Sequence, residues 1–159
     1  MIKISKKYYY SFISLFLILV IYIALSVHIT NLSIKATKKI SDQLPSSYDL
    51  QYENLQFRTS DNFLLKGWFI ENSNLQTVII IHGVDSNRSD GFTLDLIKDI
   101  YDMGYSVMTF DLRAHGESEG SDLGLTYVER EDIRSAINYI ENTKNVEEIV
   151  LLGLSYGGT

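Results

Sequence analysis

An uncharged stretch of 22 residues, from Tyr8 to Ile29, constrains most strongly what this chain can form. It reads YYYSFISLFLILVIYIALSVHI and contains no Asp, Glu, Lys or Arg. As a helix, it is long enough to cross a hydrocarbon core of about 30 Å. No face of the segment is polar, which argues against a helix packed on a soluble core. We therefore expect residues 1–30 to form an N-terminal membrane anchor.

A cleaved signal peptide is the alternative for these residues. Lys3, Lys6 and Lys7 make a positive n-region, and Ala24-Leu25-Ser26 resembles a small-x-small cleavage site. The apolar stretch is long for an h-region, so an uncleaved single span is favoured. Lysines lie on both sides of the stretch, and the free amino terminus adds one positive charge before it. The positive-inside rule therefore favours a cytoplasmic amino terminus. We expect a single-pass protein of the cell membrane with an extracytoplasmic domain.

The residues after the apolar stretch suffice for one small domain. Residues 31–47 are interpreted as a polar juxtamembrane stalk, and residues 48–159 as a partial α/β domain. All 20 acidic residues but only 11 of the 14 basic ones follow the stretch, so this part carries 11 − 20 = −9. Such an acidic surface gives no electrostatic basis for nucleic-acid binding. The sequence shows no metal-ligand spacing and no phosphate-binding glycine loop, so we expect no metal and no cofactor.

Hydrophobic periodicity predicts alternating strands and helices in the domain. One helix is expected to be capped by Ser89 and closed by Gly104, and a second to open with a capping box of Thr126 and Glu129. The strand-like runs cover residues 52–59, 63–71, 76–82, 105–110 and 148–152. The first two runs are joined by the turn residues Asp61-Asn62 and predict a hairpin. The order of elements indicates a sheet covered by helices.

The last predicted strand leads into Gly153-Leu154-Ser155-Tyr156-Gly157, a G-x-S-x-G motif. This pattern is typical of a nucleophile elbow, which holds a serine at the tip of a parallel strand. The glycines leave room for backbone that passes close to the serine. The motif recurs by chance in roughly one chain of this length in twenty. A small-residue turn with a solvated Ser155 is therefore the alternative.

Three polar, glycine-bearing blocks follow three successive predicted strands, at the edge where open parallel sheets bind ligands. They are residues 82–88 (HGVDSNR), residues 111–118 (DLRAHGES) and the Ser155 motif. Together with residues 124–132, they resemble the α/β-hydrolase superfamily. Within it they are most similar to serine aminopeptidase-like and lysophospholipase-like esterases, especially a sub-group with an N-terminal membrane span. The resemblance runs from about Leu50 to Thr159 and implies an α/β-hydrolase fold preceded by one transmembrane helix.

The resemblance also implies roles for individual residues. Ser155 matches the nucleophile, and the amides of Val84 and Tyr156 match the oxyanion-hole donors. His82 and His115 match structural histidines, because the family's base follows the serine. The remaining motif positions are those of the elbow (Gly153, Gly157, Gly158), the first block (Gly83) and the second block (Asp111, Arg113, Gly116), where Asp111 and Arg113 shape the pocket floor. Asn87 and Arg88 either buttress the oxyanion loop or form a solvated loop face.

A serine hydroxyl needs a base to become nucleophilic, and in this superfamily the acid and the histidine follow the serine. Only four residues follow Ser155, and none of them is His, Asp or Glu. We therefore expect the N-terminal part of a serine hydrolase, truncated after the elbow and inactive alone. His82 or His115 as a substitute base is a minor alternative. The complete enzyme would cleave an ester or amide carbonyl of a small-molecule, lipid or peptide substrate. The first alternative is a non-catalytic membrane-tethered fragment or half of a split protein. A second alternative is an acyltransferase or peptidase built on the same fold.

Overall fold

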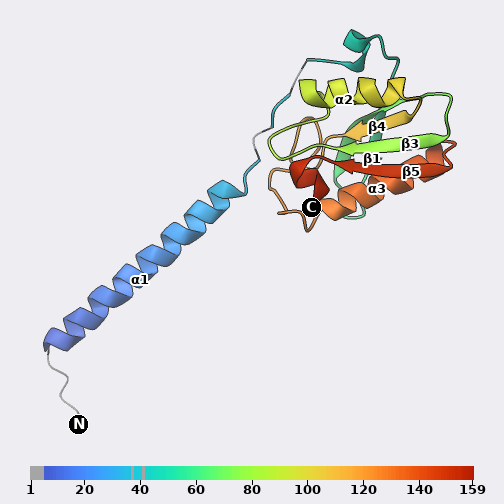
Figure 1. Ribbon diagram of the computed structural model, residues 1–159. Helices are drawn as coiled ribbons and strands as arrows, with labels where there is room; N and C mark the ends of the chain where they lie inside the picture. Colours follow the sequence, from blue (N-terminus) through green and yellow to red (C-terminus); the bar gives the residue numbers. More distant parts are fainter. Residues whose placement is uncertain (1–5, 37, 41) are drawn as a thin grey trace. The chain divides into compact units, whose positions relative to one another are not determined.

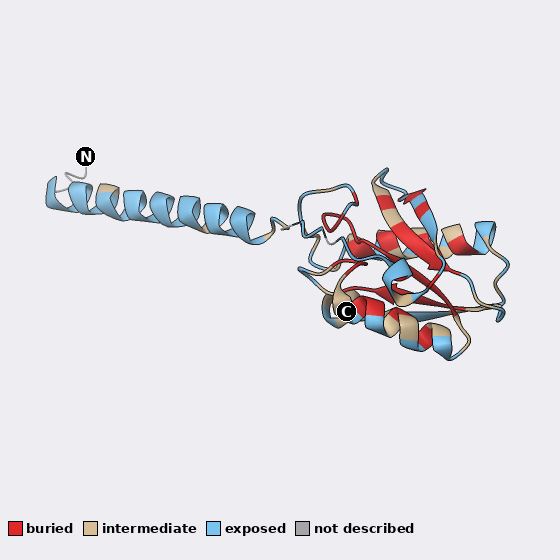
Figure 2. Cartoon of the chain, turned by 90° about the horizontal axis from the view of Figure 1, so that it is seen from above, coloured by how far each residue is buried: buried red, intermediate tan, exposed pale blue. Residues whose placement is uncertain are grey.

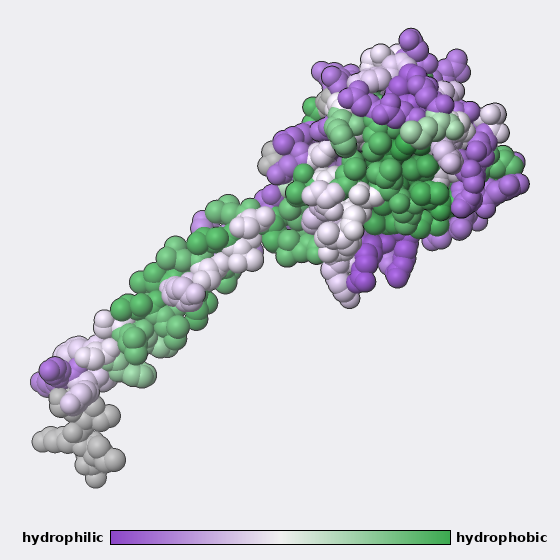
Figure 3. Space-filling view, in the orientation of Figure 1, coloured by the Kyte–Doolittle hydropathy of each residue, from purple (hydrophilic) through white to green (hydrophobic). Residues whose placement is uncertain are grey.

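The computed structural model describes residues 6–36, 38–40 and 42–159. The chain divides into two compact units, Met1–Lys35 and Ala36–Thr159. The first unit contains α1 (Lys6–Ser33), a helix of 28 residues with no buried side chain (Figure 2). By length and composition α1 can cross a membrane. It includes the whole apolar stretch from Tyr8 to Ile29, and its surface is largely hydrophobic (Figure 3).

The second unit is built on a five-stranded mixed sheet with the strand order β1-β2-β4-β3-β5 (Figure 1). The antiparallel part is the predicted hairpin of β1 and β2, which continues into β4, and Asn62 in its turn has a φ of 73°. The parallel part consists of β4, β3 and β5. The strands are β1 (Glu53–Arg58), β2 (Leu64–Ile70), β3 (Gln76–Ile81), β4 (Ser106–Phe110) and β5 (Glu148–Gly153).

Two helices cover opposite faces of this sheet and divide its core into two clusters. α3 (Glu129–Thr143) packs its Ala136 and Ile140 against the face that carries Ile79 and Ile81. α2 (Gly91–Asp102) packs on the other face, where Val78 and Ile80 of the same strand lie. β3 is therefore buried on both faces, which explains why its sequence is continuously apolar and does not alternate.

The N-terminal caps predicted for both helices are wrong. The N-cap of α2 is Asp90, whose carboxylate accepts a hydrogen bond from the Phe92 amide at 3.0 Å. Ser89 instead bonds the Asn87 side chain. α3 has no side-chain cap, and the Glu129 carboxylate accepts from the Gly124 amide at 2.7 Å and makes no capping box with Thr126. In both cases a loop contact outside the helix takes the predicted capping group.

β5 lies at the edge of the sheet, paired with β3 alone among the strands that the structure describes. Val150 and Leu151 are exposed on it, and Figure 3 shows a hydrophobic surface over this part of the domain. The strand thus leaves apolar surface uncovered in the described part of the chain.

We expect the change Asp90→Ala to lower the free energy of unfolding by about 1 kcal/mol, because it removes the carboxylate that accepts from the Phe92 amide at the start of α2. Urea unfolding of the detergent-solubilised chain measures this. Asp99→Ala, on an exposed position of the same helix, is the matched control and should cause no loss. Equal losses in both variants would show that Asp90 does not act as a cap.

Candidate active site

Ser155 stands in the tight turn that follows β5, and its backbone has a φ of 52°. Residues other than glycine rarely adopt this left-handed conformation, which occurs at functional sites where the surrounding structure holds it in place. The turn continues into a short 3-10 segment, η2 (Ser155–Gly158), and Ser155 itself is exposed. The serine is therefore presented to solvent at the carboxyl end of a parallel strand.

The two glycines of the G-x-S-x-G motif are required by close backbone contacts. A Cβ on Gly153 would lie 2.5 Å from the Cα of Gly158, and one on Gly157 would lie 2.5 Å from the carbonyl oxygen of Ile81. Real Cβ atoms do not approach other atoms this closely. The spacing of the motif thus reflects packing of the turn on itself and on the end of β3.

The loop after β3 lies directly against the serine. A Cβ on Gly83 would be 3.4 Å from the Cβ of Ser155 and 3.2 Å from the carbonyl oxygen of Leu154. The next residue, Val84, is exposed. Among the described residues, no protein acceptor is bonded to the amide of Val84 or of Tyr156. The two predicted oxyanion donors therefore belong to segments that meet at Ser155.

The side chain of Tyr156 ties the elbow to the segment before α3. Its hydroxyl accepts a hydrogen bond from the Thr126 amide at 2.9 Å, and burial together with the neighbouring Glu129 raises the pKa of Tyr156 to about 12. Leu125 and Thr126 both have positive φ, 51° and 72°. The sequence indicated only the amide of Tyr156, because no local pattern reveals a contact between residues so far apart.

The two motif histidines are buried and in contact with each other, with ring centroids 4.9 Å apart. In His82, Nε2 accepts from the Leu112 amide at 3.1 Å, so Nδ1 carries the proton and donates to the Gly83 carbonyl at 2.7 Å. Nδ1 of His115 donates to the Arg113 carbonyl at 2.9 Å. Burial lowers the pKa of His82 to about 4. This geometry favours a structural role for His82, whose two nitrogens are both engaged by the backbone.

Asp111 holds the loops after β3 and β4 together. Its carboxylate accepts from the amides of Arg88 (2.8 Å) and Glu117 (2.9 Å) and pairs with the Arg88 guanidinium. Arg88 also pairs with Glu117, which lowers the pKa of that carboxyl, and stacks over Trp68 at 4.7 Å. A Cβ on Gly116 would overlap the Asp111 carboxylate.

Arg88 and its neighbour Asn87 are both buried, and Asn87 donates to the Lys39 carbonyl at 2.8 Å. The alternative of a solvated loop face is therefore wrong for these two residues. They brace the loop that carries Gly83 and Val84.

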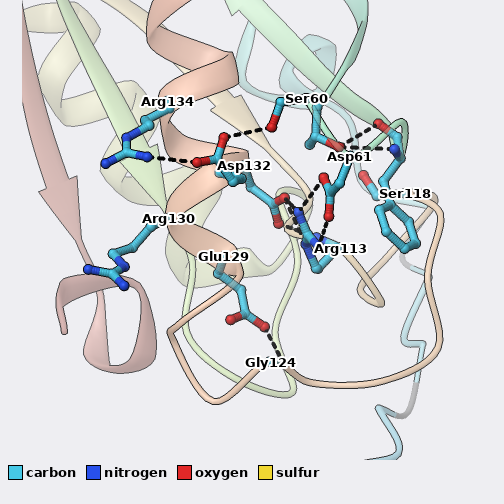
Figure 4. Close-up of polar contacts among 12 residues, drawn as sticks. Ser60, Asp61, Arg113, Ser118, Gly124, Glu129, Arg130, Asp132 and Arg134 are labelled. Atoms are coloured by element: carbon cyan, nitrogen blue, oxygen red, sulfur yellow. Dashed lines mark hydrogen bonds and ion pairs between the residues drawn. The ribbon is translucent and has the colours of Figure 1, made fainter.

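Arg113, which is buried, lies at the centre of a second polar cluster (Figure 4). It donates to Asp132 of α3 at 2.7 and 2.9 Å, and to Asp61 of the hairpin turn at 2.7 and 3.1 Å. The hydrogen bond from Arg113 lowers the pKa of Asp61 to about 2. Sequence patterns indicate Arg113 but not its pairing with these two carboxylates, since they come from distant segments. The cluster fastens the loop after β4 to the hairpin and to α3.

Among the described residues, no group of three or more His, Asp or Glu side chains is arranged to hold a metal ion. The arrangement offers an exposed serine hydroxyl in a turn that packs against the loop after β3.

Comparison with known proteins agrees with this geometry. Residues 72–159 match the family described as serine aminopeptidase, S33. The esterase Pf2001 of Pyrococcus furiosus superposes with a TM-score of 0.74 at 28% identity, covering 78% of this chain and 49% of that one. The uncharacterized protein YfhR of Salmonella typhimurium is 37% identical over 67% of this chain and 38% of its own length. The lysophosphatidylserine lipase ABHD12 of Rattus norvegicus is 30% identical over 54% of this chain and 21% of its own length.

The chain thus spans about two fifths of the length of the first curated relatives that it matches, 38% for YfhR. The likeness to the P. furiosus esterase confirms the predicted α/β-hydrolase architecture over the part that is present.

We expect Asp132→Asn to cost about 3 kcal/mol of unfolding free energy, because it leaves part of the Arg113 charge buried without its partner. Urea unfolding measures the loss. The adjacent Glu131→Gln is the control, since Glu131 makes only surface contacts with Ser60 and Arg134 and should cause little change. A similar small effect in both variants would contradict a structural role for the cluster.

The pKa of His82 also predicts a pH dependence of stability. Because this pKa falls from 6.5 to about 4 on folding, the unfolded chain binds more protons between these values, and stability is lost as pH drops through that window. The loss from pH 7 to pH 4 should approach about 3 kcal/mol. Urea unfolding at several pH values measures this dependence. The slope of the unfolding free energy against pH, between pH 6.5 and 4, should be flatter in His82→Gln. An unchanged slope would show that His82 is not the titrating group.

Proposed function

Because the chain belongs to the serine aminopeptidase S33 family and has an α/β-hydrolase fold, we propose that it acts through Ser155 as a serine hydrolase on an ester or amide carbonyl. One observation carries the proposal. Ser155 has a left-handed backbone at the end of β5 and lies against Gly83 of the loop after β3. This is the arrangement that a nucleophile elbow with an adjacent oxyanion loop requires.

In the proposed reaction, Oγ of Ser155 attacks the carbonyl carbon while a base takes its proton. The amides of Val84 and Tyr156 stabilise the negative charge on the carbonyl oxygen, and each such donor contributes about 3 kcal/mol to lowering the barrier. The tetrahedral intermediate expels the alcohol or amine, which takes up a proton, and leaves an acyl group on Ser155. Water then attacks the acyl-enzyme and releases the carboxylic acid.

The acid and base of the proposed triad follow the serine in the family's chain order. We therefore assign them to residues after Thr159 of the complete protein, and propose that the 159-residue chain alone has little activity. His82 is a poor substitute, since Leu112 and Gly83 already engage its two nitrogens.

The membrane location is proposed on the strength of α1, which is long and apolar enough to span the bilayer. With a cytoplasmic amino terminus, α1 would be a single anchor and the hydrolase domain would lie outside the cytoplasm. The substrate proposed is an acylated small molecule, lipid or peptide, and no nucleic acid or cofactor takes part. The lipase activity named for ABHD12 favours a lipid ester among these.

A fluorophosphonate probe tests the proposal on the complete protein, because it reacts only with an activated serine. We expect Ser155→Ala to lower the labelling rate by roughly a thousandfold or more, as in other serine hydrolases. Ser121→Ala, in the exposed loop after β4, is the control and should label normally. Labelling that persists in Ser155→Ala would remove Ser155 from the mechanism.

A further inference from the structure

The exposed apolar side chains of the domain are concentrated at one edge of the sheet. Among the described residues after α1, nine large hydrophobic residues are exposed, of which Val150 and Leu151 belong to edge strand β5 and Met103 lies at the opposite end of α2. The other six lie in segments at the carboxyl edge, where Ser155 stands. We call them the apolar rim: Ile40, Leu44, Val84, Phe92, Leu125 and Tyr127.

The rim is connected to the serine from two sides. Val84 follows Gly83, which packs against Ser155. Leu125 and Tyr127 flank Thr126, whose amide is bonded to the Tyr156 hydroxyl. Leu125 is 67% and Tyr127 74% exposed. The positive φ of Leu125 and Thr126 indicates that packing holds this segment in an unfavourable conformation.

The chain between α1 and this edge is short. α1 ends at Ser33, and the amide of Ala36 already donates to the Ser121 carbonyl in the loop after β4 at 3.1 Å. Two residues later, the Lys38 ammonium bonds the Ser118 carbonyl of the same loop. Only two residues thus separate α1 from the first residue of the domain, so the linker itself spans at most about 11 Å.

We propose that the apolar rim is a membrane-docking surface that rests in the headgroup region of the bilayer holding α1. Aromatic and leucine side chains at the rim suit this layer, where one end of a side chain is apolar and the other wet. Arg130, stacked on the Tyr127 ring at 4.8 Å, places a cation at the level of the phosphates. Ser155 would then take its acyl substrate, an amphiphilic ester, from the bilayer and not from solution. This last step rests on the proposed function.

Because the chain has no cysteine, single-cysteine variants can locate the rim in the membrane. Leu125→Cys and Tyr127→Cys report on the rim, and Met103→Cys is the matched control, since Met103 is 71% exposed at the other edge. Each variant of the full 159-residue chain is labelled with an environment-sensitive fluorophore and reconstituted into phosphatidylcholine vesicles. Quenching is measured with a nitroxide high on the acyl chain of a lipid, and with aqueous iodide.

We expect the lipid nitroxide to quench the rim labels at least about three-fold more than the label at position 103, and iodide to show the reverse order. Rim labels that iodide quenches as well as the control label would overturn the proposal. Labels shielded from both quenchers would also overturn it, since another part of the protein or a second copy would then cover the rim.

The quenching experiment needs no catalysis, so its failure leaves the assignment of Ser155 intact. Conversely, fluorophosphonate labelling that persists in Ser155→Ala would leave the docking surface intact. In the complete enzyme, Leu125→Ser with Tyr127→Ser should raise KM for a vesicle-borne ester several-fold, without changing the kinetics toward a short soluble ester. Met103→Ser should change neither. Equal effects on both substrates would assign these residues to the active site itself and contradict docking.

Discussion

Parallel pairing of β3 with a neighbour on each side is the constraint on which the candidate site depends. Ile81 pairs with Phe110 on one side and Gly153 on the other, so the three strands end level. The residues that follow them therefore meet at one edge, although they are far apart in the sequence. The Leu154 amide extends the ladder to the Ile81 carbonyl at 2.9 Å, which carries the pairing into the turn of Ser155. If the register slipped by one residue, Gly83 would no longer lie against the serine.

The loops at this edge are polar and cannot be held by apolar packing. Two buried arginines replace that packing: Arg88 joins the loops after β3 and β4 through Asp111, and Arg113 joins the second loop to the hairpin and α3. Buried ion pairs add little net stability, but removing one partner is costly, so they favour one loop conformation over others. The domain thus combines an apolar sheet core with a rigid polar edge, which suits a site that must hold two amides and a hydroxyl in place.

Sequence patterns that depend on near neighbours predicted much of the secondary structure correctly. The five strands, the hairpin turn at Asn62 and the close of α2 at Gly104 follow from period, turn chemistry and chirality, which act over a few residues. The N-cap predictions failed because Ser89 and Glu129 had competing partners in their loops. The pairing of Asp61 and Asp132 with Arg113 was not predicted, since a charge pair between distant segments leaves no periodic trace.

The sequence by itself determined that residues 8–29 are apolar enough to span a bilayer, that the rest forms an α/β sheet, and that Ser155 stands in a turn bounded by glycines. These conclusions rest on composition and short-range sterics. Only the tertiary structure decided which groups surround the serine: Gly83 against its side, the Tyr156 hydroxyl on Thr126, and an apolar rim at the same edge. Strand pairing and crossover helices bring these groups together, and such contacts depend on the fold of the whole domain.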